Sequence, residues 1–188
     1  SLVVNAGGAV TQTAATTVVT PTADINAAGF DVTLMETGND FSTIIHVDGV
    51  NVSLNDANNL PLGTINATSL TFGANITSYS LNGNITLSNG SLTFDKSVTM
   101  AGNSQLATGS KDVTFQGTVD GGFALTVNST GTTDFDKAIG AGTALSALTV
   151  DAGGVANFDN TIKTTGNITV DGTTINLGGD VTTTGGGK

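Results

Sequence analysis

The sequence offers few side chains that could carry out catalysis or hold a metal ion. Its 188 residues include five lysines, fifteen acidic residues, one histidine, no cysteine and no arginine. Glycoside hydrolases work with paired carboxylates, and serine hydrolases need a histidine beside the nucleophile. His46 is the only imidazole, and it lies in the stretch IIHVDGV, where strand alternation turns it outward. The sequence therefore predicts a protein that is not an enzyme and has no catalytic residue.

Two aspartates are the only candidates for a metal site. Asp136 and Asp159 each follow a phenylalanine of a repeated pattern. On successive coils of a repeat their carboxylates would lie about 4.8 Å apart, and a Ca²⁺ ion would relieve their repulsion. Lys137, Lys163 and water offer the same relief without a metal. No other cofactor is predicted.

Charge excludes two classes of partner. The net charge of −10 leaves no basic surface for a phosphate backbone or for anionic lipids, so binding to nucleic acid is not expected. No run of eighteen apolar residues is present, so no insertion into a membrane as a helix is expected. The absence of cysteine removes disulfides and thiolate chemistry.

An internal repeat of about 20 residues is the strongest signal in the chain. A large apolar residue recurs every 19 to 23 residues, and an aliphatic residue follows each one four places later. A second ladder keeps the same spacing at Ile65, Ile85, Leu106, Leu125, Leu148 and Ile168. Apolar residues alternate with Thr, Asp and Asn, as in strands with one buried face. The large residues are Phe72, Phe94, Phe115, Phe135, Phe158 and Leu177, and the aliphatic residues are Ile76, Val98, Val119, Ile139, Ile162 and Val181.

A period this short predicts an all-β fold, a single-stranded parallel β-helix or solenoid of about nine coils. Right-handed winding is expected from the general preference of parallel crossovers. Residues at equivalent positions would then stack along the axis, the phenylalanines in one column and the aliphatic residues in another. We expect less regular coils with longer corners over residues 1–64, regular coils over 65–184 and a flexible glycine-rich tail over 185–188.

Three stretches of the sequence resemble the repeated units of very large filamentous-haemagglutinin-type exoproteins. They are GNDFSTIIHVDGVNVSLNDANNLPLGTI (Gly38–Ile65), LTVNSTGTTDFDKAIGAGTALSALTVDAGG (Leu125–Gly154) and AVTQT (Ala9–Thr13). The resemblance implies a right-handed β-helical stalk and export through an outer-membrane partner by two-partner secretion. It also implies a secreted, cell-surface location and a role in adhesion, matrix formation or aggregation.

The expectation for function is a non-enzymatic stalk of a secreted bacterial filamentous adhesin. Such a stalk would mediate attachment or aggregation by presenting distal regions to a host-cell or glycan receptor. A second hypothesis is a self-assembling structural subunit of an extracellular filament, sheath or biofilm matrix, joined through open β-helix ends. A third is a polysaccharide-active β-helix enzyme, which the lack of arginine and the lone histidine disfavour.

Overall fold

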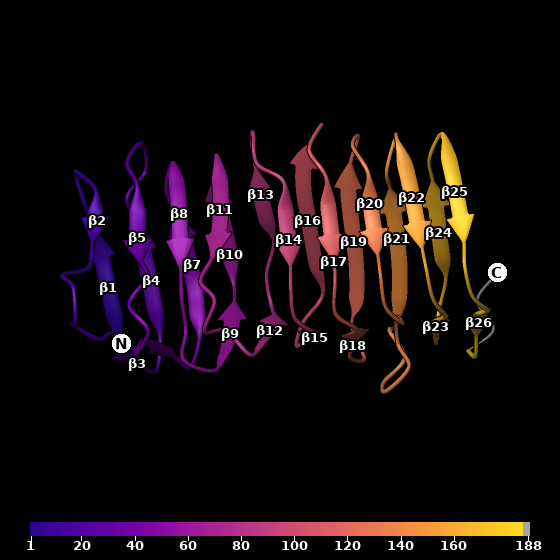
Figure 1. The fold of residues 1–188 in the computed structure, drawn as a ribbon, viewed down its shortest axis with the longest axis horizontal. Helices are drawn as coiled ribbons and strands as arrows, with labels where there is room; N and C mark the ends of the chain where they lie inside the picture. Colours follow the sequence, from indigo (N-terminus) through magenta and orange to yellow (C-terminus); the bar gives the residue numbers. More distant parts are fainter. Residues whose placement is uncertain (186–188) are drawn as a thin grey trace.

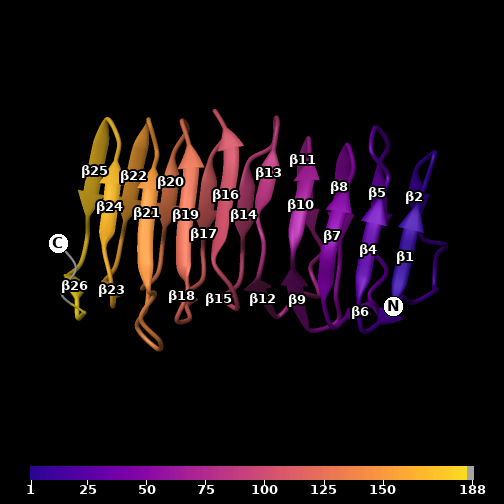
Figure 2. The ribbon, with the colours of Figure 1, turned by 180° about the vertical axis from the view of Figure 1, so that it is seen from behind.

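The chain winds into a β-solenoid with three parallel faces, as the repeat predicts. A computed structural model describes residues 1–185, and within that range every regular element is a strand. Every pairing between strands is parallel. Figures 1 and 2 show the coils stacked side by side along the long axis, with the chain ends at opposite ends of the rod. The predicted all-β parallel solenoid is therefore confirmed.

One face is an unbroken sheet, called the long sheet below. Its nine strands follow one another in chain order from the first coil to the last. They are β1 (Leu2–Asn5), β4 (Ala23–Asn26), β7 (Ile44–Asp48), β10 (Thr64–Ala67), β13 (Ile85–Leu87), β16 (Ser104–Gly109), β19 (Ala124–Ser129), β21 (Ala147–Asp151) and β24 (Ile168–Asp171).

The second face is divided into two sheets and is called the split face below. Its first sheet holds β2 (Val10–Thr11), β5 (Val32–Leu34), β8 (Asn51–Leu54) and β11 (Ser69–Phe72). The other sheet holds β14 (Leu92–Phe94), β17 (Val113–Phe115), β20 (Thr133–Phe135), β22 (Val155–Phe158) and β25 (Thr174–Leu177). No pairing joins β11 to β14, although they lie on successive coils.

The third face consists of short strands in three groups. The first group is β3 (Val19–Thr20) with β6 (Asp40–Phe41). The middle group is β9 (Asn59–Leu62), β12 (Ser78–Leu81), β15 (Val98–Met100) and β18 (Val119–Asp120). The last group is β23 (Ile162–Thr164) with β26 (Val181–Thr183), and single bridges at Ile139 connect β18 to β23.

Side chains alternate between the interior and the surface along each strand, which is why the sequence alternates apolar and polar residues. In β16 and β19, for example, alternate residues are buried. The second predicted ladder is wrong in one detail, because Leu106 is level with Val127 and Leu125 is level with Ser104. A shift of two residues leaves every side chain on its original face, so Leu106, Leu125 and Val127 all stay buried.

The corners between the split face and the third face change length in the middle of the molecule. Before the change they span residues 35–39, 55–58 and 73–77, and after it they span 95–97, 116–118, 159–161 and 178–180. The longer corners thus extend past residue 64, where the sequence places the end of the less regular coils. The tail predicted over 185–188 lies, apart from Gly185, outside the described residues.

Candidate functional site

The phenylalanines of the repeat form a column of stacked rings on the inner side of the split face. Ring centroids are 5.1 Å apart between Phe94 and Phe115, 4.6 Å between Phe115 and Phe135, and 5.2 Å between Phe135 and Phe158. All four rings are buried. Leu177 continues the column in the last coil, where its side chain is exposed.

The aliphatic residues of the repeat form a second row, with one exception. Val98, Val119, Ile139, Ile162 and Val181 are level with one another on successive coils. Ile76 is not part of this row, because the residue level with Val98 on the preceding coil is Tyr79. The four-residue spacing fails here because the corner after Phe72 is a longer one, and Ile76 is buried inside that corner. The sequence prediction for Ile76 is therefore wrong in register.

Phe72 also departs from the predicted column. Its backbone is level with Leu54 of β8 and has no strand partner on the side of β14. Its ring still contacts the Phe94 ring, at 5.6 Å between centroids and an interplanar angle of 31°. Phe72 is half-buried, whereas Phe94 and Leu54 are fully buried. The column is thus continuous inside the solenoid while the sheet above it is open.

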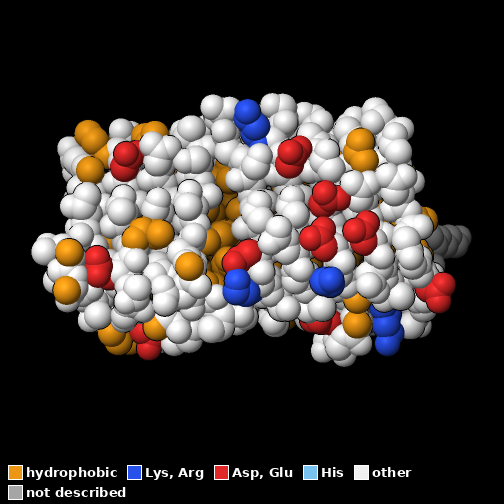
Figure 3. Space-filling model, viewed as in Figure 1, with side chains coloured by type: hydrophobic (Ala, Val, Ile, Leu, Met, Phe, Trp, Pro, Cys, Tyr) orange, Lys and Arg blue, Asp and Glu red, His pale blue; other side chains and the backbone are white. Residues whose placement is uncertain are grey.

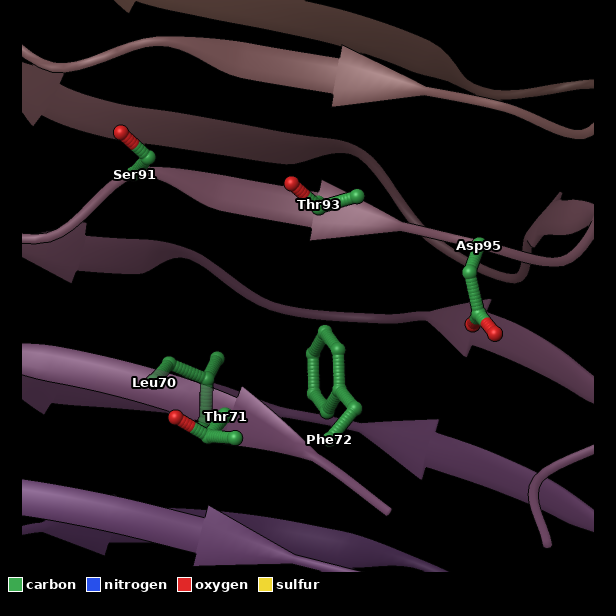
Figure 4. Close-up of a pocket in the computed structure, with 6 residues that line it drawn as sticks. All are labelled: Leu70, Thr71, Phe72, Ser91, Thr93 and Asp95. Atoms are coloured by element: carbon green, nitrogen blue, oxygen red, sulfur yellow. The ribbon is translucent and has the colours of Figure 1, made fainter. Parts of the chain in front are cut away.

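A notch of about 270 Å³ lies at this opening, bounded by Leu70, Thr71 and Phe72 on one side and by Ser91, Thr93 and Asp95 on the other. Two further hollows on the surface are smaller, at about 190 Å³ and 230 Å³. Figure 3 shows it as a hollow near the middle of the face, with hydrophobic side chains at its bottom. Figure 4 shows the lining residues on two strands that lie apart, with Leu70, Thr71 and Phe72 on β11 and with Ser91, Thr93 and Asp95 on and just after β14.

Both walls of the notch are free strand edges. Gly73 N–H donates to the Leu54 carbonyl and Ser69 N–H to the Val50 carbonyl, so the odd-numbered residues of β11 face β8. Leu70 and Phe72, which alternate with them, direct their N–H and C=O groups into the notch. On the other wall, Leu92 N–H donates to the Asp112 carbonyl. Leu92 therefore faces β17, and the backbone groups of Ser91 and Thr93 face the notch.

The notch closes at one end. Asn89 N–H donates to the Thr68 carbonyl at 3.0 Å, which brings the two coils together just before β14 begins. Gly90 packs against Ser69 so closely that a Cβ atom at residue 90 would lie 2.9 Å from the Ser69 Cα. A glycine is needed at this position for the coils to meet. Beyond this point no backbone pairing joins β11 to β14.

Tyr79 fills the interior beneath the notch. It is the only tyrosine of the chain and is fully buried. Its ring centroid lies 4.8 Å from that of Phe72 and 5.1 Å from that of Phe94. A larger side chain stands here where other coils have leucine, valine or isoleucine. Its hydroxyl reaches the rim, where it donates to Asp95 Oδ1 at 2.7 Å.

Asp95 is a charged group at the open end of the notch. Burial opposes its ionisation, but hydrogen bonds from Lys96 and Tyr79 outweigh burial and lower the pKa of its carboxyl group. Burial raises the pKa of the Tyr79 hydroxyl, and the bond to Asp95 raises it further. At neutral pH the rim therefore carries a carboxylate that is held by a neutral phenol and a lysine.

The other residues that the sequence singled out do not line the notch. His46 lies on the outer side of the long sheet between two carboxylates, with Nδ1 3.4 Å from Asp24 Oδ1 and Nε2 3.0 Å from Asp48 Oδ1. Asp136 and Asp159 directly follow Phe135 and Phe158, which are paired on successive coils as the repeat predicts. Over residues 1–185 no group of three or more His, Cys, Asp or Glu side chains is placed to hold a metal ion. Calcium between these two aspartates stays a prediction.

The notch was missed from the sequence although a signal for it exists. Residues 69–72 and 91–94 share the tetrapeptide SLTF, which suggests two equivalent, stacked strands. The informative difference comes after the tetrapeptide, where Phe72 is followed by a long corner and Phe94 by a short one. A change of corner length between two identical strands is the feature that marks the break.

Comparison with known proteins gives one match. A family described as repeats of unknown function (DUF5649) matches residues 1–48. No curated protein and no solved structure matches the chain. Among residues 1–185 there is no helix of the length and hydrophobicity that crossing a membrane requires.

Proposed function

We propose that the chain is a non-enzymatic stalk segment of a secreted bacterial cell-surface adhesin. In this proposal stacked coils keep distal binding regions away from the cell and so mediate attachment or aggregation. A host-cell or glycan receptor would bind those distal regions, and an outer-membrane partner would export the chain. The resemblance of Gly38–Ile65 and Leu125–Gly154 to filamentous-haemagglutinin-type repeats is the source of the export, location and adhesion parts of the proposal.

The observation that carries the proposal is the unbroken long sheet. Nine consecutive strands pair in parallel along the axis, and the buried side chains form one core beneath them. Backbone hydrogen bonds in every coil and continuous side-chain packing favour a stiff rod, which is the mechanical property that a stalk needs. The outward positions of the long sheet are mostly polar, as in β19 and β21.

A self-assembling structural subunit is the second candidate. In this candidate a second copy would stack on the last described coil and cover Ile175, Leu177 and Val181. A polysaccharide-active enzyme is a weaker candidate, since His46 pairs with two carboxylates on an open sheet surface and not within the notch.

Negative-stain electron microscopy of the purified 188-residue chain separates the first two candidates. Short rods of uniform length at all concentrations support the stalk. Ordered polymers that lengthen with concentration would favour the assembling subunit. A depolymerisation assay on a panel of polysaccharides tests the third candidate, and activity that is lost in His46→Ala would overturn the non-enzymatic proposal.

A further inference from the structure

We propose that the notch between β11 and β14 binds an extended peptide, which pairs in parallel with the two free strand edges. The site would make the solenoid itself a binding element, beyond the role of a stalk. Its ligand is a short segment of another protein in strand conformation, recognised mainly through its backbone.

Hydrogen-bonding complementarity is the first argument. Leu70 and Phe72 on one wall and Ser91 and Thr93 on the other direct N–H and C=O groups into the same space, and none of these groups has a partner among residues 1–185. On each wall the free groups recur every second residue, as they do along a strand edge. An extended peptide presents N–H and C=O groups on both of its sides with that same repeat, so a single peptide can bond to both walls together.

The packed interior sets the size of the ligand's side chains. Beneath the notch the rings of Phe72, Tyr79 and Phe94 are already in contact with one another. An inserted strand therefore cannot add a large side chain to the core. We infer that the peptide carries Ala, Gly or Ser at its inward positions and that about four residues fit, the length of the SLTF segment on each wall.

Charge sets the polarity of the ligand. Asp95 stands at the end of the notch where both walls terminate, its side chain is 42% exposed, and the chain carries a net charge of −10. A peptide parallel to the walls has its carboxyl-terminal part at that end. A lysine or arginine there would lie beside Asp95 and share its carboxylate with Lys96, which already bonds to it. With the net charge of −10, this favours a basic peptide with small inward residues.

The test uses the blocked hexapeptide acetyl-Thr-Ala-Thr-Ala-Lys-Thr-amide with the isotope-labelled 188-residue chain. Amide hydrogen exchange is followed by NMR with and without the peptide. In the free protein we expect fast exchange at the amides of Leu70, Phe72 and Thr93, which have no backbone partner. We expect protection at Leu92 and Phe94, which face β17. Adding the peptide should slow exchange at Leu70, Phe72 and Thr93 at least about tenfold and leave Leu92 and Phe94 unchanged.

Four controls test whether the peptide binds through backbone pairing and charge. The same peptide N-methylated at its third and fourth residues loses a donor toward each wall and should bind at least about tenfold more weakly. Thr93→Pro removes the N–H that faces the notch without removing a bond of the existing sheet, and should abolish the slowing. Thr93→Val keeps that N–H and should bind the peptide as the parent does. Replacing the peptide's lysine by glutamate should weaken binding.

Three results would overturn the proposal. The first is unchanged exchange at Leu70, Phe72 and Thr93 at saturating peptide. The second is equal binding of the parent and N-methylated peptides. The third is a glucan or chitin oligosaccharide that slows exchange at these amides when the peptide does not. Because the N-methylated peptide is tested on the unmodified chain, the proposal stays testable even if Thr93→Pro does not fold.

Discussion

The coils before the notch and the coils after it fill the same corner of the solenoid with different chemistry. Before it, buried amides bridge the longer corners: Asn39 accepts from Val18 N–H at 2.8 Å and donates to the Leu34 carbonyl at 3.2 Å. On the next coil, Asn55 donates to the Met35 carbonyl and to Asn75 Oδ1, each at 3.2 Å. After the notch, short corners leave the interior to stacked phenyl rings.

This difference teaches how one repeat length accommodates two interiors. A longer corner places backbone groups inside the solenoid, and those groups need polar partners such as Asn39, Asn55 and Asp56. Burial raises the pKa of Asp56 even though its carboxylate accepts from the backbone N–H groups of Phe41 and Asn58. A short corner places no such groups inside, so aromatic rings fill the space. The strands separate where one arrangement meets the other.

The largest expected effect comes from removing a ring of the phenylalanine column in the coils after the notch. Phe115→Ala removes a fully buried ring that is stacked on both sides, and should lower the free energy of unfolding by about 3–5 kcal/mol. Urea denaturation followed by circular dichroism measures it. Phe123→Ala, at a side chain that is 43% exposed, is the matched control and should change little. Equal effects of the two substitutions would show that the column is not a source of stability.

A smaller effect is expected from removing a buried asparagine in the coils before the notch. Asn39→Ala leaves Val18 N–H without its acceptor and removes one of the two donors to the Leu34 carbonyl, which keeps the bond from Asn55 N–H. The substitution should lower the free energy of unfolding by about 1–3 kcal/mol. Asn176→Ala is the control, because Asn176 donates to Asn157 on an exposed ladder in the other half, where substitutions change stability by about 0.5 kcal/mol or less. A larger loss of stability in Asn176→Ala than in Asn39→Ala would contradict this assignment.

A hydrogen bond from Tyr79, beneath the notch, to Asp95, on its rim, links two successive coils. Tyr79→Phe keeps the ring and removes the hydroxyl, and should lower the free energy of unfolding by about 1–2 kcal/mol at pH 7. The pKa of the Asp95 carboxyl is lowered in the folded protein. The ionised carboxylate therefore stabilises the fold at pH values above the ordinary carboxyl pKa, and this stabilisation is lost as the pH falls through the pKa of the folded state. Denaturation curves of both proteins from pH 7 to acid should therefore converge, and a gap that persists in acid would contradict this.

The smallest expected effect appears in alkali. The Tyr79 pKa is raised in the folded protein, so above pH 10.0, its ordinary value, the unfolded chain ionises first and stability falls as pH rises. Since Tyr79 is the only tyrosine, phenolate absorbance reports this group alone. We expect no phenolate absorbance until the protein unfolds. In Tyr79→Phe the part of the alkaline loss of stability that comes from the Tyr79 hydroxyl should be absent. Titration of the folded chain near pH 10 would refute the burial of the hydroxyl.

Much of the fold was predictable because the apolar ladders encode it. Phe94, Phe115, Phe135 and Phe158 stack as their spacing predicts, since a strand face and a coil length together determine which side chains become neighbours. Ile76 was misplaced because the four-residue rule holds only for a short corner. The notch could not be found from the ladders, because side chains stay in contact across it and only the backbone pairing is interrupted. Interior asparagines such as Asn39 were not distinguished from the many exposed ones.

The unbroken long sheet has a consequence for how the molecule would respond to a pulling force. Its interstrand hydrogen bonds point along the rod, so tension on the two chain ends loads one coil at a time and does not shear many bonds together. We expect a sawtooth of small, similar extension steps in single-molecule stretching, each releasing about 70 Å of chain for a coil of roughly 20 residues. Such a rod would absorb mechanical work in many small unfolding steps and would shorten again as its coils refold after the load is removed.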